Sequence, residues 1–311
     1  MKNLPLFYYP HTWLWIDDDR TLLNAMTLAF SEDHQVLPFQ SANKCLEFLE
    51  KQYQPPSSQF SFLKSNIEDE NYGTLQRTPV DFDVTTIAKL ADNPERKDEI
   101  SAMVIDYNMP EMNGFTLAEQ TSHSPIQKIL LTGNAQDNDA ITAFNNNLIQ
   151  RFVQKADAQM YGKLSDYLTE LSRDYFRKLT DPLLTHLEAE VKLPLSDPIF
   201  IKFFENYCKN NNIIEYYLID KNGSFLCINN KGERSCLAVQ SNRSIDTWLA
   251  LHGEEKTLSQ DIITALTERK KIPFFGVGKE AWQLDPAEWS EHFYLPEILA
   301  GRETYYWVTV K

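Results

Sequence analysis

The sequence predicts an α/β domain with a doubly wound parallel sheet, followed by an α+β domain. Short apolar runs alternate with amphipathic segments between about residues 13 and 155, which is typical of a parallel sheet wrapped by helices. Polar residues follow several of these runs directly. After about residue 193, apolar runs are joined by Asn-Gly and Lys-Gly turns, which indicates antiparallel pairing. A length of 311 residues suits about two domains.

The apolar pattern places five strands in the first half. The first strand, 13–16, precedes a helix at 20–30 with regularly spaced apolar residues. The second strand, 36–39, contains Pro38, so we expect it at an edge of the sheet. Ser41 can cap the next helix. The remaining strands are expected at 103–105, 128–131 and 151–153, with helices at 114–121 and 137–145.

The connection between about residues 51 and 99 is too long for a compact α/β domain. It contains Pro55-Pro56-Ser57-Ser58, an acidic run at 68–70 and a short apolar stretch near 84–90 that predicts a helix. We interpret it as an insertion before the third strand. A surface for a partner and a tolerated decoration without function both fit this composition.

A long helix is expected from about 160 to 179, with a break near Asp181-Pro182. Leu164, Leu168, Leu171 and Tyr175 are spaced as in a coiled coil. The helix therefore either packs onto its own domain or forms a homodimer through residues 160–180.

The second domain is expected to combine a helix at 199–209 with a three-stranded antiparallel meander. Its predicted strands are 216–220, 225–228 and 236–239, followed by a helix around Ile262 to Leu266 and further strands at 272–275 and 305–310. Trp282, Trp289, His292 and Phe293 lie close in sequence, and core or surface packing explains them better than a ligand site.

Four cysteines show no C-x-x-C spacing. Cys227 and Cys236 could face each other across the predicted hairpin around Lys231-Gly232, but reduced thiols are expected in a cytosolic protein.

The charge balance disfavours several classes of function. The net charge is −14, from 30 basic and 44 acidic residues, and most of the excess lies in the first half. Such a surface repels nucleic acid, so we expect no DNA partner. No apolar run approaches the roughly 20 residues of a membrane helix, and the N-terminus lacks a signal-peptide pattern. We therefore expect a cytoplasmic protein without a membrane partner.

Polar residues at the ends of the predicted strands indicate a phosphoryl-transfer site. Asp17 and Asp18 follow the first strand, Asp106 ends the third, and Thr132 and Lys155 end the fourth and fifth. The carboxyl ends of parallel strands meet at one edge of a sheet. Carboxylates there, with the backbone carbonyl of Asn108, suit Mg²⁺ or Mn²⁺, which prefer oxygen ligands. Asp106 can then accept a phosphoryl group, since positive charge from the metal and the lysine offsets the repulsion.

With these residues in this order, the chain resembles the receiver domain of bacterial two-component response regulators. The resemblance covers about residues 10–175 except the insertion, and its most specific part runs from Asp106 through Met109-Pro110 to Gly114. It implies a flavodoxin-like fold and these roles: Asp106 as phosphoacceptor; Asp17, Asp18, Asp106 and Asn108 as metal ligands; Thr132, Phe152 and Lys155 as switch and phosphoryl-contacting residues. It also implies a histidine kinase or phosphotransfer protein as donor.

The sequence departs from the family pattern in two places. The insertion lengthens the interval between the acidic pair and Asp106, and Ala156 stands where the family usually has a proline. We expect a receiver domain at 10–158, a linker helix region at 159–192 and an α+β output domain, with some likeness to PAS-type folds, at 193–311.

The output activity is open from sequence. We expect a regulator that catalyses only its own phosphorylation and dephosphorylation and acts through protein–protein interaction. The alternatives are a receiver-gated enzyme, a small-ligand sensor, or a scaffold in which the receiver is a phosphate sink.

Overall fold

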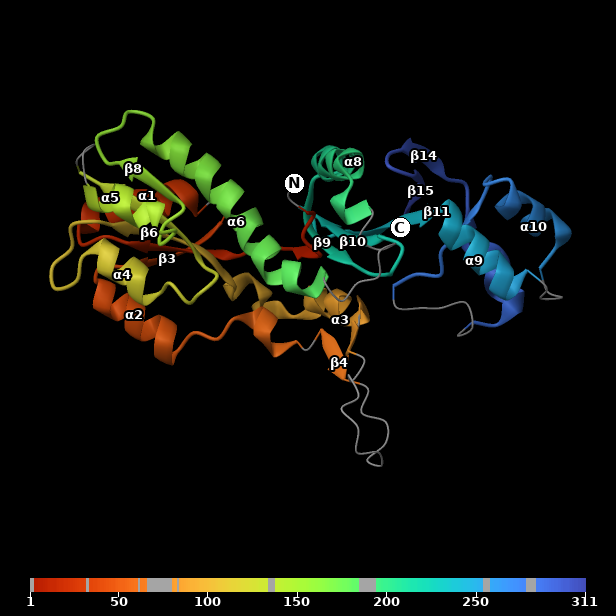
Figure 1. The fold of residues 1–311 in the computed structure, drawn as a ribbon, viewed down its shortest axis with the longest axis horizontal. Coiled ribbons are helices and arrows are strands. Elements are labelled where there is room, and N and C mark those ends of the chain that lie inside the picture. Colours follow the sequence, from red (N-terminus) through yellow and green to blue (C-terminus); the bar gives the residue numbers. More distant parts are fainter. Residues whose placement is uncertain are drawn as a thin grey trace, which may run out of the picture. The chain divides into compact units, whose positions relative to one another are not determined.

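The computed structural model describes residues 3–31, 34–60, 62–65, 80–82, 84–133, 138–184, 194–253, 258–277 and 284–311. They form two compact units (Figure 1). Unit 1 comprises Met1–Tyr8, Ser61–Asp92 and Thr180–Lys311, and unit 2 comprises Tyr9–Phe60 and Asn93–Leu179. The chain therefore crosses between the units four times. This division differs from the expected one, because the first residues and much of the insertion group with the C-terminal half.

Unit 2 contains a five-stranded parallel sheet, as predicted. Its strands are β3 (Gln35–Phe39), β2 (Thr12–Ile16), β6 (Ile100–Asp106), β7 (Gln127–Thr132) and β8 (Arg151–Gln154), in that spatial order. β3 is an edge strand, where the missing N–H of Pro38 is tolerated. Every residue of β2, β6 and β7 is buried, as expected for strands covered on both faces.

The helices of unit 2 begin at capping residues that the sequence provides. Asp19 caps α1 (Arg20–Phe30), Ser41 caps α2 (Ala42–Lys51), and Asn113 caps α4 (Gly114–Gln120). α5 spans Asn138–Asn145 and α6 spans Met160–Leu184. The expected break at Asp181-Pro182 is wrong, because α6 continues through Pro182 to Leu184.

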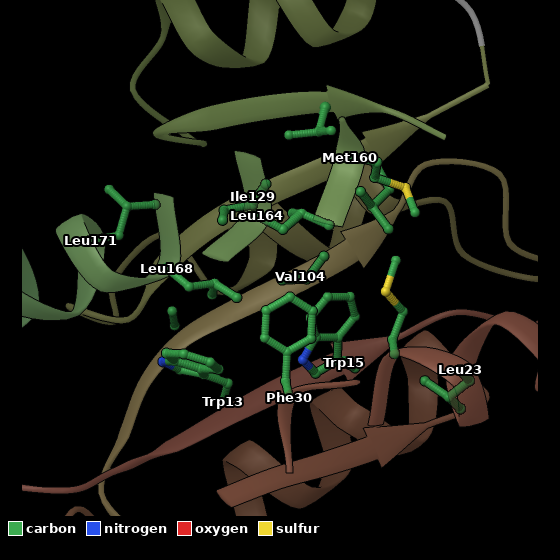
Figure 2. Close-up of a cluster of buried hydrophobic side chains, with 14 residues drawn as sticks. Trp13, Trp15, Leu23, Phe30, Val104, Ile129, Met160, Leu164, Leu168 and Leu171 are labelled. Atoms are coloured by element: carbon green, nitrogen blue, oxygen red, sulfur yellow. The ribbon is translucent and has the colours of Figure 1, made fainter. Parts of the chain in front are cut away.

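α1 and α6 cover one face of this sheet, and their apolar side chains form its main core (Figure 2). The core lies against Trp13 and Trp15 of β2 and Val104 of β6, and it also contains Ile129, Leu131 and Val153 of the next strands. On α1, Phe30 packs against both tryptophan rings, with centroid separations of 6.1 Å to Trp13 and 5.3 Å to Trp15. α4 contacts both α2 and α5.

The regularly spaced side chains of α6 pack into their own unit. Leu164 and Leu168 are fully buried, and Leu171 and Tyr175 are 1% exposed. Leu164, Leu168 and Leu171 belong to the core between α6 and the sheet. The sequence allowed either packing onto the domain or a dimer contact for this spacing. For these four residues the structure shows packing onto their own domain.

The predicted insertion contains more regular structure than its composition suggested. Its described elements are η1 (Pro56–Gln59), β4 (Leu63–Ser65), β5 (Val80–Phe82), α3 (Val84–Lys89), η2 (Leu90–Asp92) and η3 (Pro94–Asp98). β4 and β5 pair antiparallel, and α3 contacts β9 of unit 1. The acidic run at 68–70 lies outside the described residues.

Unit 1 is built on a six-stranded antiparallel sheet with the order β1-β9-β10-β11-β15-β14. The predicted meander is confirmed as β9 (Ile213–Leu218), β10 (Phe225–Asn229) and β11 (Arg234–Ser241), and the last predicted strand as β15 (Thr304–Val310). The sequence analysis missed β1 (Phe7–Tyr8) and β14 (Glu297–Ala300). β1 is too short to give a periodic signal, and its pairing partner β9 lies some two hundred residues away in the chain.

Aromatic side chains attach α8 (Pro198–Asn210) to this sheet. Phe204 lies 4.5 Å from Phe225 and 4.9 Å from Tyr216 between ring centroids, and Phe200 lies 5.3 Å from Tyr305. The helix starts at the buried Asp197, which accepts hydrogen bonds from the N–H of Ile199, the N–H of Arg302 and the hydroxyl of Tyr305. One carboxylate thus caps α8 and fixes the β14–β15 turn.

Unit 1 also contains a smaller core. Its elements are α9 (Asn242–His252), α10 (Gln260–Thr267), β12 (Ile272–Pro273), η5 (Pro286–His292) and β13 (Phe293–Tyr294). Trp289 and Phe293 are buried in this core, which supports packing for these two residues. Trp282 lies outside the described residues.

The four cysteines are free thiols. Cys236 pairs with Leu226, and Cys227 pairs with Ser235. The two cysteines are therefore not opposite each other in the hairpin. Direct pairing of Cys227 with Cys236 would need a register shifted by one residue.

Among the helices that the structure describes, none is both long and apolar enough to cross a membrane.

Lys128 of β7 is a buried cation whose nearest partner is a carbonyl. It is 3% exposed, and its ammonium donates to the backbone oxygen of Ile126 at 3.2 Å. Burial, with a smaller contribution from the charge of Lys178, lowers the pKa of Lys128 to about 8. In the unfolded chain, the pKa of this lysine keeps its ordinary value of 10.5. Below pH 8 the buried charge therefore lowers the free energy of unfolding by its full amount, and this loss of stability disappears as pH rises through 10.5.

We expect Lys128→Met to be more stable than the wild type at pH 7, by up to about 3 kcal/mol, because it removes this penalty. The advantage should shrink at pH 10. Urea unfolding at both pH values measures it, with the exposed Lys44→Met as a control for loss of one charge. An advantage of equal size at pH 7 and pH 10 would contradict the assignment.

Candidate functional site

The carboxyl edge of the parallel sheet brings together the polar residues expected there. β2 ends at Ile16, directly before Asp17, and β6 ends at Asp106 itself. β7 ends at Thr132, and Lys155 follows β8. These four strand ends are adjacent because β2, β6, β7 and β8 are neighbours in the sheet.

Lys155 links two buried carboxylates. Its ammonium lies 2.8 Å from Oδ2 of Asp17 and 2.9 Å from Oδ1 of Asp106. Both aspartates are 3% exposed, whereas Asp18 is exposed. The sequence analysis expected Lys155 beside Asp106, and the structure adds its second contact with Asp17.

Burial raises the pKa of Asp106 above its ordinary value, and the charge of Asp17 raises it further. The hydrogen bond from Lys155 and the backbone N–H of Asn108 oppose this rise. Burial lowers the pKa of Lys155, but its hydrogen bonds to Asp17 and Asp106 outweigh burial, so that its pKa lies above the ordinary value. The lysine therefore stays charged, and it offsets the repulsion between the two acids.

Three carboxylates at this edge could hold a divalent ion. One oxygen from each of Asp17, Asp18 and Asp106 lies within 4.8 Å of the other two. This spacing and the all-oxygen donor set fit Mg²⁺, which usually binds one or two carboxylates and keeps several waters. Because Asp18 is exposed, a bound ion could keep water ligands on that side.

The neighbouring Asp19 has a different task. Its carboxylate accepts hydrogen bonds from the N–H groups of Thr21 and Leu22 and caps α1. The N–H of Asp19 in turn donates to Oδ1 of Asp17 at 2.9 Å. The start of α1 thus orients the first acid of the site.

The loop after Asp106 is held close to the end of β6. The N–H of Gly114 donates to the oxygen of Tyr107 at 3.0 Å, and Glu111 has a φ of 67°. A Cβ added at Gly114 would lie 2.3 Å from the backbone oxygen of Asp106. Only glycine fits there without moving the backbone of Asp106. The sequence analysis quoted Gly114 as part of a motif but did not assign it this role.

Thr132 and Lys155 are joined through the backbone. The N–H of Lys155 donates to the carbonyl oxygen of Thr132 at 2.8 Å. Thr132 is 1% exposed. The Lys155–Ala156 peptide bond is trans, and Lys155 nevertheless reaches both acids. The alanine in place of the family's usual proline therefore does not remove the lysine from the site.

Phe152 lies on β8 with its ring partly in solvent. It is 39% exposed and meets the ring edge of Phe144 on α5 at a centroid separation of 6.5 Å. Phe144 is itself 44% exposed. The two rings form a small exposed aromatic pair on the surface of α5 and β8.

No protein-family model and no curated protein sequence matches this chain. Among solved structures, the chain is similar to the response regulator LqsR of Legionella pneumophila, with 26% identity and a TM-score of 0.80 over 100% of this chain and 90% of that one. A CheY-like receiver domain protein of Methanospirillum hungatei JF-1 matches at 14% identity and a TM-score of 0.36, over 54% of this chain and 98% of that one. That score is too low to support an argument.

The likeness to LqsR spans both units, and the parallel sheet with its acidic edge is the part that the residues themselves predicted. Unit 2 has the fold of a receiver domain, and the chain as a whole is similar to a response regulator.

Proposed function

We propose that this protein is a phosphorylation-activated response regulator in which Asp106 accepts a phosphoryl group from a histidine kinase or a phosphotransfer protein. The observation that carries the proposal is the pair of contacts from Lys155 to Asp17 and Asp106 at the carboxyl edge of the sheet. Such a regulator would work in the cytoplasm and would catalyse only its own phosphorylation and dephosphorylation.

In the proposed reaction, an oxygen of Asp106 forms a bond to phosphorus as the bond from phosphorus to the donor imidazole breaks, and the imidazole recovers a proton. Asp17, Asp18, Asp106 and the carbonyl of Asn108 would hold Mg²⁺ or Mn²⁺, which supplies positive charge to the phosphoryl oxygens. Lys155 would exchange one carboxylate contact for a phosphoryl oxygen.

The switch would involve Thr132 and Phe152. The hydroxyl of Thr132 would donate to the new phosphoryl oxygen, and the ring of Phe152, now 39% exposed, would turn towards the space that Thr132 leaves. This would change the surface of α5 and β8. We propose that the output is protein–protein interaction. A homodimer through residues 160–180 would have to use the exposed side of α6, because Leu164 and Leu168 are fully buried.

A small-ligand sensor in unit 1 is a second candidate, favoured by a cavity of about 530 Å³ beside α8. Phe203, Tyr207 and Trp307 line it together with Asn206 and Asn210. Aromatic and amide side chains together suit a planar organic ligand. A ligand here should change the fluorescence of wild-type protein and should not bind Trp307→Ala.

The phosphoacceptor assignment predicts that Asp106→Asn loses phosphorylation by acetyl phosphate and Mg²⁺, because the amide is a far weaker nucleophile than the carboxylate. Intact-protein mass spectrometry measures the added phosphoryl group. A matched control is Asp157→Asn, which removes a half-buried carboxylate beyond β8 that pairs with Lys163. Phosphorylation of Asp106→Asn at the wild-type rate would exclude Asp106 as the acceptor.

The metal assignment predicts that Asp18→Asn weakens Mg²⁺ binding at least about tenfold, since it removes one charged ligand. Asp19→Asn is the matched control: asparagine also caps helices, and Asp19 faces the N–H groups of α1. Calorimetric titration with MgCl₂ compares the two variants. Equal losses of affinity in both would point to the overall charge of the loop and against a ligand role for Asp18.

A further inference from the structure

Another buried carboxylate lies at the opposite end of the receiver sheet from Asp17 and Asp106. Glu99 is fully buried, directly before β6, and its oxygens accept four hydrogen bonds. The donors are the N–H of Ser57 at 2.8 Å, the hydroxyl of Ser57 at 2.9 Å, the hydroxyl of Tyr9 at 3.3 Å and the hydroxyl of Tyr175. A fully buried acid is costly unless its charge is compensated in this way.

These partners come from every part of unit 2 that leads into unit 1. Tyr9 is the first residue of unit 2 after the first crossing, and Ser57 lies just before the second, at Phe60. Glu99 lies just after the third crossing, at Asn93, and Tyr175 lies just before the fourth, at Leu179. One carboxylate therefore joins the four chain segments that connect the units.

Three of these four segments lead to the acidic site at their other ends. Tyr9 precedes β2, which ends before Asp17. Glu99 precedes β6, which ends at Asp106, and Tyr175 lies on α6, which begins shortly after Lys155. Each of the three residues that form the ion-pair network of the site is thus connected by one regular element to the Glu99 cluster.

A second buried polar contact ties these three elements together along their length. The indole N–H of Trp13 on β2 donates to the hydroxyl of Ser172 on α6 at 2.9 Å. That hydroxyl lies 3.1 Å from the hydroxyl of Ser101 on β6. Polar contacts between strands and helix in an apolar core fix their register more strictly than hydrophobic packing does.

We propose that Glu99 is a positioning residue that transmits to unit 1 the conformational change caused by phosphorylation of Asp106. A change at the carboxyl edge alters β2, β6 and α6 together, and the Glu99 cluster converts that change into a common displacement of the four connecting segments. This inference rests on the proposed function, because it needs Asp106 to be the acceptor.

The test compares the full-length wild type with Glu99→Gln by hydrogen–deuterium exchange, with and without beryllofluoride and Mg²⁺ as the phosphoryl mimic. Glutamine keeps the shape, and the hydroxyl partners can reverse their protons, so the variant should fold; its amide nitrogen cannot accept the hydrogen bonds that one carboxyl oxygen accepts. In wild type, beryllofluoride should protect residues 107–114 and change exchange in β9 and β10. In Glu99→Gln, the protection at 107–114 should remain and the change in β9 and β10 should fall below half.

Tyr175→Phe is the second variant if Glu99→Gln does not fold. It removes one donor and leaves the carboxylate, and a partial loss of the response in unit 1 is expected. Leu23→Ala controls for a general loss of stability, because Leu23 belongs to the core cluster of α1 and the sheet, which contains none of Tyr9, Ser57 and Tyr175. Its response in unit 1 should equal that of wild type.

Three results would overturn parts of this scheme in distinguishable ways. A full response of unit 1 in Glu99→Gln, or in Tyr175→Phe, would overturn the role of Glu99. So would a wild type in which beryllofluoride protects 107–114 without any change in unit 1. Absence of protection at 107–114 in the wild type would instead overturn the proposed function.

Discussion

The receiver site depends on one ammonium group held between two buried carboxylates. Asp17 and Asp106 are both almost fully buried, and two such charges side by side would repel each other strongly in a medium of low polarity. The contacts of Lys155 with both acids compensate this repulsion. A metal ion and a phosphoryl group would each replace some of these contacts, so the arrangement suits the phosphoryl transfer to Asp106 that we propose.

The surrounding fold serves to place these three residues. The parallel sheet gathers the ends of β2, β6 and β8 at one edge, Asp19 starts α1 and orients Asp17, and Gly114 lets the loop after Asp106 approach the backbone. At the far edge of the sheet, Glu99 gathers the segments that lead to unit 1. The receiver unit therefore has a buried acidic centre at each end of its strands: one is compensated by a cation and the other by neutral donors.

Much of this organisation could be read from the sequence. The strand–helix alternation, the edge position of the strand with Pro38, the antiparallel meander of the second half and the strand-end acids all follow from local patterns that span few residues. Features that depend on distant partners could not be read. β1 has only two residues and is a strand because β9 is available to pair with it. The α6 spacing allowed two interpretations, and only the packing of Leu164 and Leu168 against the sheet distinguishes them.

The sequence by itself determined which residues form the candidate site, because the residue types at the strand ends and their order along the chain are local information. The tertiary structure decided how the charges are balanced and where the chain divides. The second contact of Lys155, the closeness of Gly114 to Asp106 and the gathering of Tyr9, Ser57 and Tyr175 around Glu99 join positions far apart in sequence. Such contacts depend on how helices and strands pack in space, and no periodic pattern along the chain records that packing.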